Sequence, residues 1–219
     1  AIAMNLVEPM HHIGTVPNLD AITTLAVIGL SLLAGLVSRL FVFSLHKTHH
    51  IFAMIENAYV RAIIGGAIII ILTLLVGNQD YNGVGSQMIE RSLSGNVPIY
   101  AFLLKIFFTA ITLSAGYKGG EIIPSLIIGA TLGSAFGTIF GLPAGLWAEV
   151  GMVAVFCGVT NCPITSLLIG FELFNFQASS FLLIAVAISY IVSGYSGLYK
   201  AQMIIFSKTS RKRIERNTN

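Results

Sequence analysis

The chain has 219 residues, of which 55% are hydrophobic and only 10% are charged, and its mean hydropathy is +0.86. About 25% of the residues of a soluble domain are charged, so this composition excludes an ordinary soluble domain. The formal net charge is only +3, and no motif or aromatic pattern accompanies the basic residues. These features exclude a nucleic-acid-binding protein.

Long stretches of the chain carry no Asp, Glu, Lys or Arg. They are residues 21–38, 62–79, 122–148, 150–171 and 173–199. A helix needs about 20 mostly apolar residues to cross a bilayer. The pattern therefore predicts an all-α, polytopic protein that is integral to a lipid bilayer, and we expect the cell (inner) membrane.

The chain opens on AIAMNLVEPMHH, which has neither an initiating Met nor the charged start of a signal peptide. We interpret this stretch as the end of a helix that begins upstream, in a longer protein. Residues 21–45 then predict one long span with small residues that allow close helix packing. The polar connection that follows holds His46, His49 and His50 in an i, i+3, i+4 pattern. Because no carboxylate is near, we expect a loop at the membrane edge there and no metal site.

Two further spans are predicted over residues 60–76 and 99–115, on either side of a glycine-rich break. From residue 116 onward the apolar segments are short and are interrupted by Gly, Pro and Asn. Helices that stop within a membrane expose unpaired N–H groups at their N-termini. Such backbone is tolerated only where it is buried in protein or lines a polar cavity, and broken helices mark substrate sites in transporters. The pattern indicates a pathway for a solute.

The stretch AGYKGGEIIPSLIIGATLGS is the most informative one. Its helix is expected to start around Ile122 to Pro124, because proline is favoured in the first helical turn. Gly119 and Gly120 let the backbone approach a ligand closely, and the first-turn amides with the positive end of the helix dipole attract anions. Two interpretations stay open on these residues alone. One is an anion site; in the other, the glycines serve packing and Glu121 complements the helix dipole.

Four segments resemble motifs of the CLC family of chloride channels and transporters, and they occur in the family's order. SAGYKGGEIIPSLIIGATLGSAFG resembles its third anion-binding motif, including a Gly-x-x-x-Gly spacing. NCPITSLLIGFELF resembles a proline-containing helix that ends in a glutamate, here Glu172. SGLYKAQMI resembles the segment with an anion-binding tyrosine, here Tyr199, and YNGVGSQMIERSL resembles the glycine-rich break of the same half.

The resemblance implies a fold. The family's membrane domain has two inverted halves of short, broken and tilted helices, and this chain matches only the second half. Residues 1–206 would form this half-domain, and residues 207–219 a basic tail, whose Lys and Arg predict a cytoplasmic C-terminus. The first-half motifs have no match here, so the chain is expected to need an N-terminal half that carries the gating glutamate. The family forms homodimers, with contacts implied near residues 163–175 and 178–193.

The function implied is the transport of a halide, chloride or fluoride, by a channel, voltage-gated in some members, or by an anion/proton antiporter. Backbone N–H groups of Glu121 and Ile122 would coordinate the ion, and the Tyr199 hydroxyl would donate to it. A tyrosine that serves only as an interfacial anchor is the alternative. No cofactor or metal is implied. The residues carried over as anion-binding are Gly119, Gly120, Glu121, Ile122, Ile123, Pro124 and Tyr199.

Glu121 departs from the usual chloride members, which have an apolar residue at this position. The sequence GGE resembles the fluoride-exporting branch of the family, although Ile123 stands where that branch has threonine. We therefore expect Glu121 to couple anion movement to proton movement. The alternative is a simple ion pair between Glu121 and Lys118.

Other classes of function fit less well. A membrane-embedded enzyme would need a nucleophile paired with a base, and all five histidines precede residue 51, so no enzyme is expected. A structural or assembly half-subunit without an ion site remains the alternative. Trp147 is expected as an interfacial anchor, and Cys157 and Cys162 as small buried residues.

Overall fold

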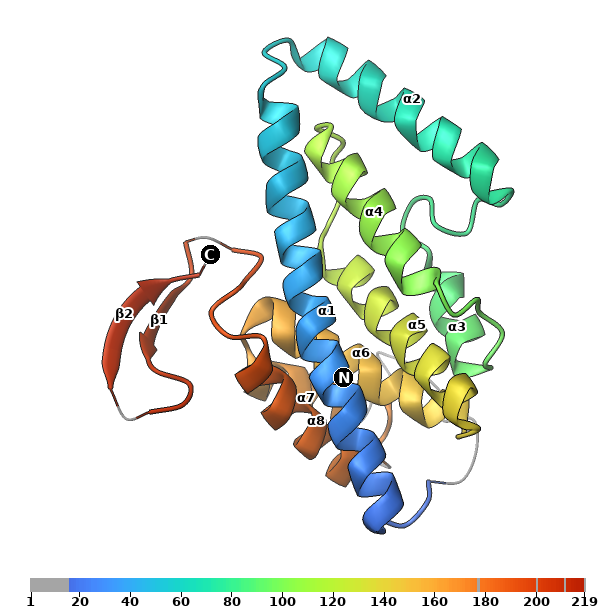
Figure 1. The fold of residues 1–219 in the computed structure, drawn as a ribbon, viewed down its shortest axis with the longest axis vertical. Helices are drawn as coiled ribbons and strands as arrows, with labels where there is room; N and C mark the ends of the chain where they lie inside the picture. Colours follow the sequence, from blue (N-terminus) through green and yellow to red (C-terminus); the bar gives the residue numbers. More distant parts are fainter. Residues whose placement is uncertain (1–15, 177, 200, 211, 219) are drawn as a thin grey trace.

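The computed structural model describes residues 16–176, 178–199, 201–210 and 212–218. These residues form eight α-helices and one antiparallel β-hairpin (Figure 1). The expectation for the opening residues and their upstream helix lies outside the described residues. In chain order the elements are α1 (Ala21–Ala53), α2 (Ala58–Val76), α3 (Ser86–Leu93), α4 (Ala101–Ser114), α5 (Ile122–Phe140), α6 (Ala144–Thr160), α7 (Pro163–Leu173), α8 (Ser179–Val192), β1 (Met203–Phe206) and β2 (Arg213–Asn217).

The lengths of the helices match a membrane protein with short spans. Within the described ranges, α1, α2 and α5 are long and apolar enough to cross a membrane. Helices α4, α6, α7 and α8 are apolar but only 10–17 residues long. At about 1.5 Å per residue, such helices are shorter than the roughly 30 Å hydrocarbon core. The all-α membrane class and the short helices after residue 116 are thus confirmed.

Helix α6 forms the centre of the bundle, and each of its residues after the first is buried. It packs against α1, α5 and α8. The approach of α5 to α6 depends on glycine, because a Cβ atom added at Gly133 would lie 1.8 Å from the Trp147 carbonyl oxygen. A Cβ atom at Gly129 would lie 2.4 Å from the Gly151 carbonyl oxygen. The Gly-x-x-x-Gly spacing of α5 therefore brings the two backbones into contact.

Helix α2 lies outside this core and runs obliquely to α1 (Figure 1). Among its residues only Gly65 is buried, where it faces Ala115 at the end of α4. The Asn57 side chain caps the start of α2, and Gly77 ends it in the left-handed region, at a φ of 76°. Most of the apolar surface of α2 is therefore exposed in this chain.

Helix α1 continues to Ala53, so the loop predicted for the residues after position 45 is wrong. Leu45 and Phe52 are both buried, and their spacing of seven residues keeps them on one face of a continuous helix. The helix ends only shortly before the cap of α2. Within the described part of the chain, no group of three His, Cys, Asp or Glu side chains is placed to hold a metal ion. Three residues predicted to lie in a loop at the membrane edge thus lie on helix α1. They are His46, His49 and His50.

Trp147 is fully buried, so its prediction as an interfacial anchor is also wrong. The tight connection between α5 and α6 directs the first turn of α6 back against α5. The Trp147 ring centre lies 5.6 Å from that of Phe136 on α5 and 6.3 Å from that of Phe181 on α8. Cys157 is buried as expected, whereas Cys162 is half-buried, and both thiols are free.

A β-hairpin follows α8, in a region for which no strand was predicted. Strands β1 and β2 pair antiparallel. The Lys208 ammonium donates to the Tyr190 carbonyl oxygen at 2.8 Å and to the Asn161 side chain. The Gln202 amide donates to the Thr160 carbonyl oxygen at 3.1 Å. The hairpin is therefore attached to the ends of α6 and α8, and its cytoplasmic location stays a prediction.

Candidate functional site

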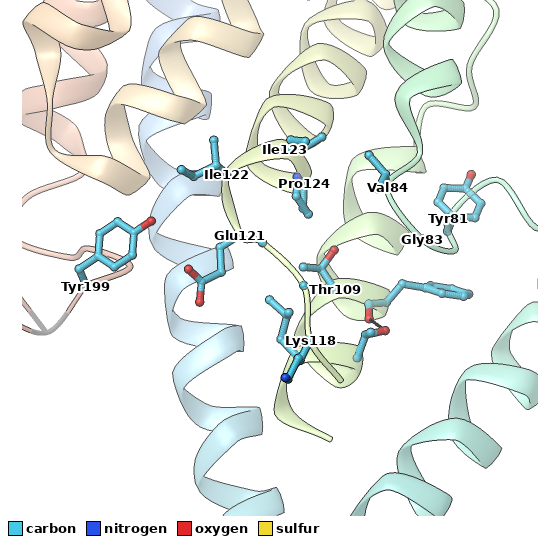
Figure 2. Close-up of a pocket in the computed structure, with 15 residues that line it drawn as sticks. Tyr81, Gly83, Val84, Thr109, Lys118, Glu121, Ile122, Ile123, Pro124 and Tyr199 are labelled. Atoms are coloured by element: carbon cyan, nitrogen blue, oxygen red, sulfur yellow. Dashed lines mark hydrogen bonds between the residues drawn. The ribbon is translucent and has the colours of Figure 1, made fainter. Parts of the chain in front are cut away.

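A cavity of about 560 Å³ lies where α4, the start of α5, the segment before α3 and the segment after α8 meet (Figure 2). All seven residues predicted to bind an anion line it, including Gly119, Ile123 and Tyr199. The cavity thus brings together residues from two distant parts of the chain. The other lining residues are Tyr81, Gly83, Val84, Phe108, Thr109, Thr112, Leu113 and Lys118.

The start of α5 forms one side of the cavity. The helix begins at Ile122, as predicted, with Glu121 as its N-cap residue, and the Glu121 side chain makes no capping hydrogen bond. Pro124 has no N–H group, and the Ser125 amide donates to the Glu121 carbonyl oxygen at 3.1 Å. The N-terminal turn therefore presents backbone amides and the positive end of the helix dipole, without a carboxylate that caps them.

Tyr199 approaches from the segment after α8, and its hydroxyl points toward the start of α5 (Figure 2). Tyr199 is 45% exposed in this chain, which is consistent with its position at a cavity. The Thr218 hydroxyl donates to the Tyr199 carbonyl oxygen, so the hairpin holds the backbone of this residue. A neutral phenol and neutral amides can therefore surround one small ion.

Glu121 and Lys118 both line the cavity, but the ion pair considered for them does not form. No hydrogen bond or ion pair joins the two side chains in the described structure. Figure 2 shows their charged ends apart, with the Glu121 carboxylate on the side of Tyr199. The carboxylate is thus beside the candidate site with no fixed cationic partner.

Helix α4 supplies lining residues that were not predicted from the sequence. Phe108, Thr109, Thr112 and Leu113 lie on one face of the helix. The Thr112 hydroxyl donates to the Phe108 carbonyl oxygen at 2.7 Å. The signal that could have identified this face is the occurrence of polar residues, with Lys105 one turn earlier, in an otherwise apolar segment.

The glycine-rich segment before α3 forms the wall of the cavity on the side away from Tyr199, through Tyr81, Gly83 and Val84 (Figure 2). Tyr81 is only 2% exposed, and its ring centre lies 5.7 Å from that of Phe108 on α4. The segment was identified from its resemblance to a family motif, but its place in the cavity wall follows only from the fold.

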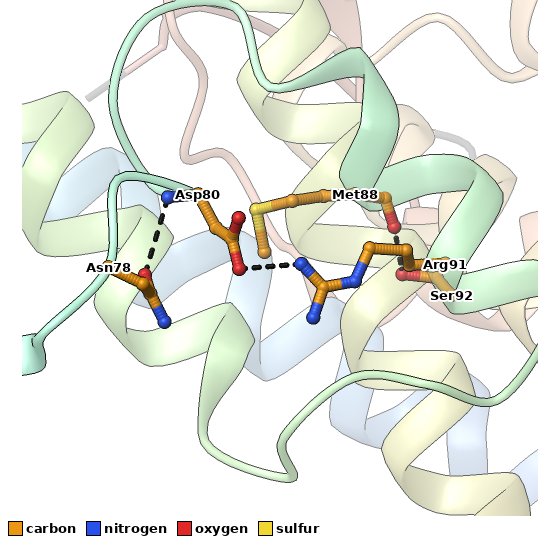
Figure 3. A network of polar contacts seen from close by, with 5 residues as sticks. All are labelled: Asn78, Asp80, Met88, Arg91 and Ser92. Carbon is orange, nitrogen blue, oxygen red and sulfur yellow. Dashed lines mark hydrogen bonds and ion pairs between the residues drawn. The ribbon is translucent and has the colours of Figure 1, made fainter.

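An exposed ion pair holds the same segment from outside (Figure 3). Arg91 on α3 lies 2.6 Å from the Asp80 carboxylate, and the Asp80 amide donates to the Asn78 side chain at 3.3 Å. On α3 itself, the Ser92 hydroxyl donates to the Met88 carbonyl oxygen at 2.6 Å. The Asp80 carboxylate, which belongs to the same segment as the lining residues Tyr81, Gly83 and Val84, is therefore already paired.

The remaining motif residues lie elsewhere. Helix α7 begins at Pro163 and carries Glu172 in its last turn, as the motif implies. Neither residue lines the cavity. Their segment contributes to packing around α6 and α8.

Residues 1–194 match a family model described as "Voltage gated chloride channel". The chain belongs to this family, the CLC family. The chain is 33% identical over 216 residues to the chloride/fluoride channel protein of Pseudomonas syringae pv. tomato, which covers 95% of this chain and 48% of that protein. It is 27% identical over 175 residues to the H(+)/Cl(-) exchange transporter ClcA of Klebsiella pneumoniae (strain 342), covering 74% of this chain and 37% of ClcA.

A comparison of the chain's structure with solved structures also identifies the CLC fold. The chain superposes on the crystal structure of a CLC-type fluoride/proton antiporter with a TM-score of 0.83 and 28% identity, covering 90% of this chain and 51% of that one. The relatives described here are channels and transporters, not enzymes in the usual sense. This CLC chain spans about half the length of these relatives, or less.

Proposed function

We propose that the complete protein, of which this chain forms part, transports a halide across a membrane as a CLC-type channel or anion/proton antiporter. One observation carries the proposal: the cavity joins the uncapped start of α5 to the Tyr199 hydroxyl. The relatives whose names include fluoride make fluoride the first anion to test and chloride the second. In this proposal the transported species are the halide and, in an antiporter, protons, and no cofactor takes part.

Each group at the cavity has a role in this proposal. The backbone N–H groups of Glu121 and Ile122 hold the anion, with Gly119 and Gly120 allowing its close approach. The Tyr199 hydroxyl donates a hydrogen bond from the other side. Neutral donors bind a monovalent ion weakly enough for it to leave again, which conduction requires. An N-terminal half supplies the remaining ligands and the gate.

The proposal also includes the assembly and its orientation. The complete protein is a homodimer in the cell membrane, and α7 and α8 contribute to the contact. Their exposed apolar side chains support this, among them Ile164 at 73% and Leu183 at 51% exposed. The basic residues around Lys212 and Arg213 support a cytoplasmic C-terminus, because Lys and Arg are enriched on cytoplasmic flanks.

The test is a flux assay on the complete protein in liposomes, with electrodes for fluoride and chloride. We expect halide release that depends on the protein. Tyr199→Phe should weaken halide binding by about tenfold or more, because a hydrogen bond to a charged group contributes roughly 1.5–3 kcal/mol. Tyr59→Phe is the control, since this residue is 82% exposed at the start of α2.

Two results would contradict these expectations. Liposomes that release neither anion would overturn halide transport and favour an assembly subunit without an ion site. Normal flux with an unchanged halide affinity in Tyr199→Phe would remove Tyr199 from the site, while leaving transport itself in place.

A further inference from the structure

Lys105 is a fully buried cation in a membrane helix. It lies on α4, one turn before Thr109 of the cavity lining, and is 1% exposed. A charge removed from water is costly unless hydrogen bonds or an opposite charge compensate it. The neighbours of this ammonium therefore indicate why the chain retains a lysine there.

The ammonium donates to two backbone carbonyl oxygens of the glycine-rich segment, those of Tyr81 and Gly83, each at 3.1 Å. No ion pair to a carboxylate is formed by Lys105 within the described residues. Asp80, the acid of this segment, is paired with Arg91 instead (Figure 3). The compensation of the buried charge therefore comes from the backbone of the cavity wall.

Glycine lets the segment wrap around the ammonium. Gly83 and Gly85 both have positive φ, at 57° and 72°, values that residues with a side chain rarely adopt. A Cβ atom at Gly85 would lie 3.0 Å from the Lys105 Nζ atom. The glycines of this break thus serve the approach of the backbone to Lys105.

The direction of the two carbonyl groups matters for the cavity. Tyr81 and Gly83 line it, whereas Lys105 does not. Carbonyl oxygens are the negative ends of the peptide dipoles, and they would repel an anion in the cavity if they pointed into it. Because both accept hydrogen bonds from Lys105, they are directed to an atom outside the lining.

We propose that Lys105 is a positioning residue for the anion cavity. Its ammonium turns the carbonyl oxygens of Tyr81 and Gly83 away from the ion and adds a fixed positive charge behind this wall. The inference rests on the proposed function, because it assigns a role toward the same anion. It adds to the α5 amides and the tyrosine a third element, from α4, that was not part of the motif-based site.

The test compares Lys105→Met with Arg91→Met in the complete, purified protein. Both changes remove one positive charge that is bound to the same segment, through two hydrogen bonds for Lys105 and one ion pair for Arg91, but Arg91 is exposed and does not line the cavity. Fluoride and chloride affinity are measured by calorimetry, together with the melting temperature with and without the halide. We expect Lys105→Met to raise the halide Kd by at least about tenfold and Arg91→Met to change it little, since exposed ion pairs contribute little.

Two further variants separate positioning from folding. Lys105→Arg keeps the charge and the donors and should retain most of the affinity. Lys105→Gln keeps a donor without the charge; it replaces Lys105→Met if that variant does not fold, and it should also raise the halide Kd. A folded neutral variant with a lower melting temperature but a wild-type halide Kd would show a structural role alone and overturn the inference. If the wild-type protein bound no halide, the proposed function would fail first.

Discussion

Glu121 is the residue at which the chemistry of this site is most unusual. It occupies the N-cap position of α5 and lines the cavity, yet it neither caps the helix nor pairs with Lys118. An ionised carboxylate about 4 Å from an anion would repel it by roughly 4 kcal/mol at an effective dielectric constant of 20. An anion can therefore share this cavity with Glu121 only when the carboxyl group is protonated or turned away. Such a dependence of anion binding on the state of the Glu121 carboxyl group would be the physical basis for the role in proton movement that we propose for this residue.

Glu121→Gln in the complete protein tests this role. The amide cannot take up or release a proton, so we expect proton transport to fall and the preference between F⁻ and Cl⁻ to change. The measurement is the parallel flux of protons and of each halide from liposomes. Glu56→Gln, at an exposed position between α1 and α2, is the matched control. Unchanged proton transport together with an unchanged halide preference would refute the coupling role.

At the scale of elements, the contact between α5 and α6 positions the site. The start of α5 is held in place because its later turns pack on the fully buried α6. This contact needs glycine at its centre, because a Cβ atom at Gly133 would lie 1.8 Å from a backbone oxygen. The same α5 helix therefore presents its amides at one end and its small residues along its length.

Gly133→Ala tests the contact. The added methyl group forces α5 and α6 apart, and overpacking of this kind costs roughly 1–3 kcal/mol or more. We expect a lower melting temperature and a lower yield of folded protein. Gly29→Ala is the control, because its Cβ atom would lie 3.8 Å from Phe136, an ordinary contact. Equal melting temperatures for the two variants would argue against close α5–α6 packing.

At the scale of the whole molecule, much apolar surface remains exposed in this chain. Helix α2 buries only Gly65, and large side chains on α1, α7 and α8 are exposed as well. In the assembly that we propose, lipid, an N-terminal half and a second protomer would each cover part of this surface. The chain spans about half the length of these two relatives.

A single substitution on α7 tests whether part of this exposed apolar surface forms the proposed contact between protomers. Leu168 is 60% exposed, and Leu168→Trp should disrupt a contact between protomers through steric overlap. We expect the complete wild-type protein in lipid nanodiscs to have twice the protomer mass and the variant to shift to the protomer mass. Tyr59→Trp, at an exposed position on α2, should leave the mass unchanged. A wild-type protein with the mass of one protomer would contradict the dimer.

Parts of the candidate site could be predicted because they depend on local sequence. Pro124 and the paired glycines specify where α5 begins, and the structure places the start at Ile122. The seven predicted residues gather at one cavity, although their binding of an anion stays a prediction. The polar residues of α4 carried a signal, but their place at the cavity and the role that we propose for Lys105 depend on contacts between segments that are not adjacent in the sequence.

By itself, the sequence determined the membrane class, the short helices and the start of α5, because charge-free runs and helix-start residues act within a few turns of the chain. Only the tertiary structure decided that Trp147 is buried, that α1 continues through the histidines, and that α4 and the segment before α3 line the same cavity as the start of α5 and Tyr199. The physical reason is that lipid and protein interior are both apolar, so hydropathy alone does not show which face of a helix each one covers. That choice is made by the packing of the helices, which also brings distant polar groups to one cavity.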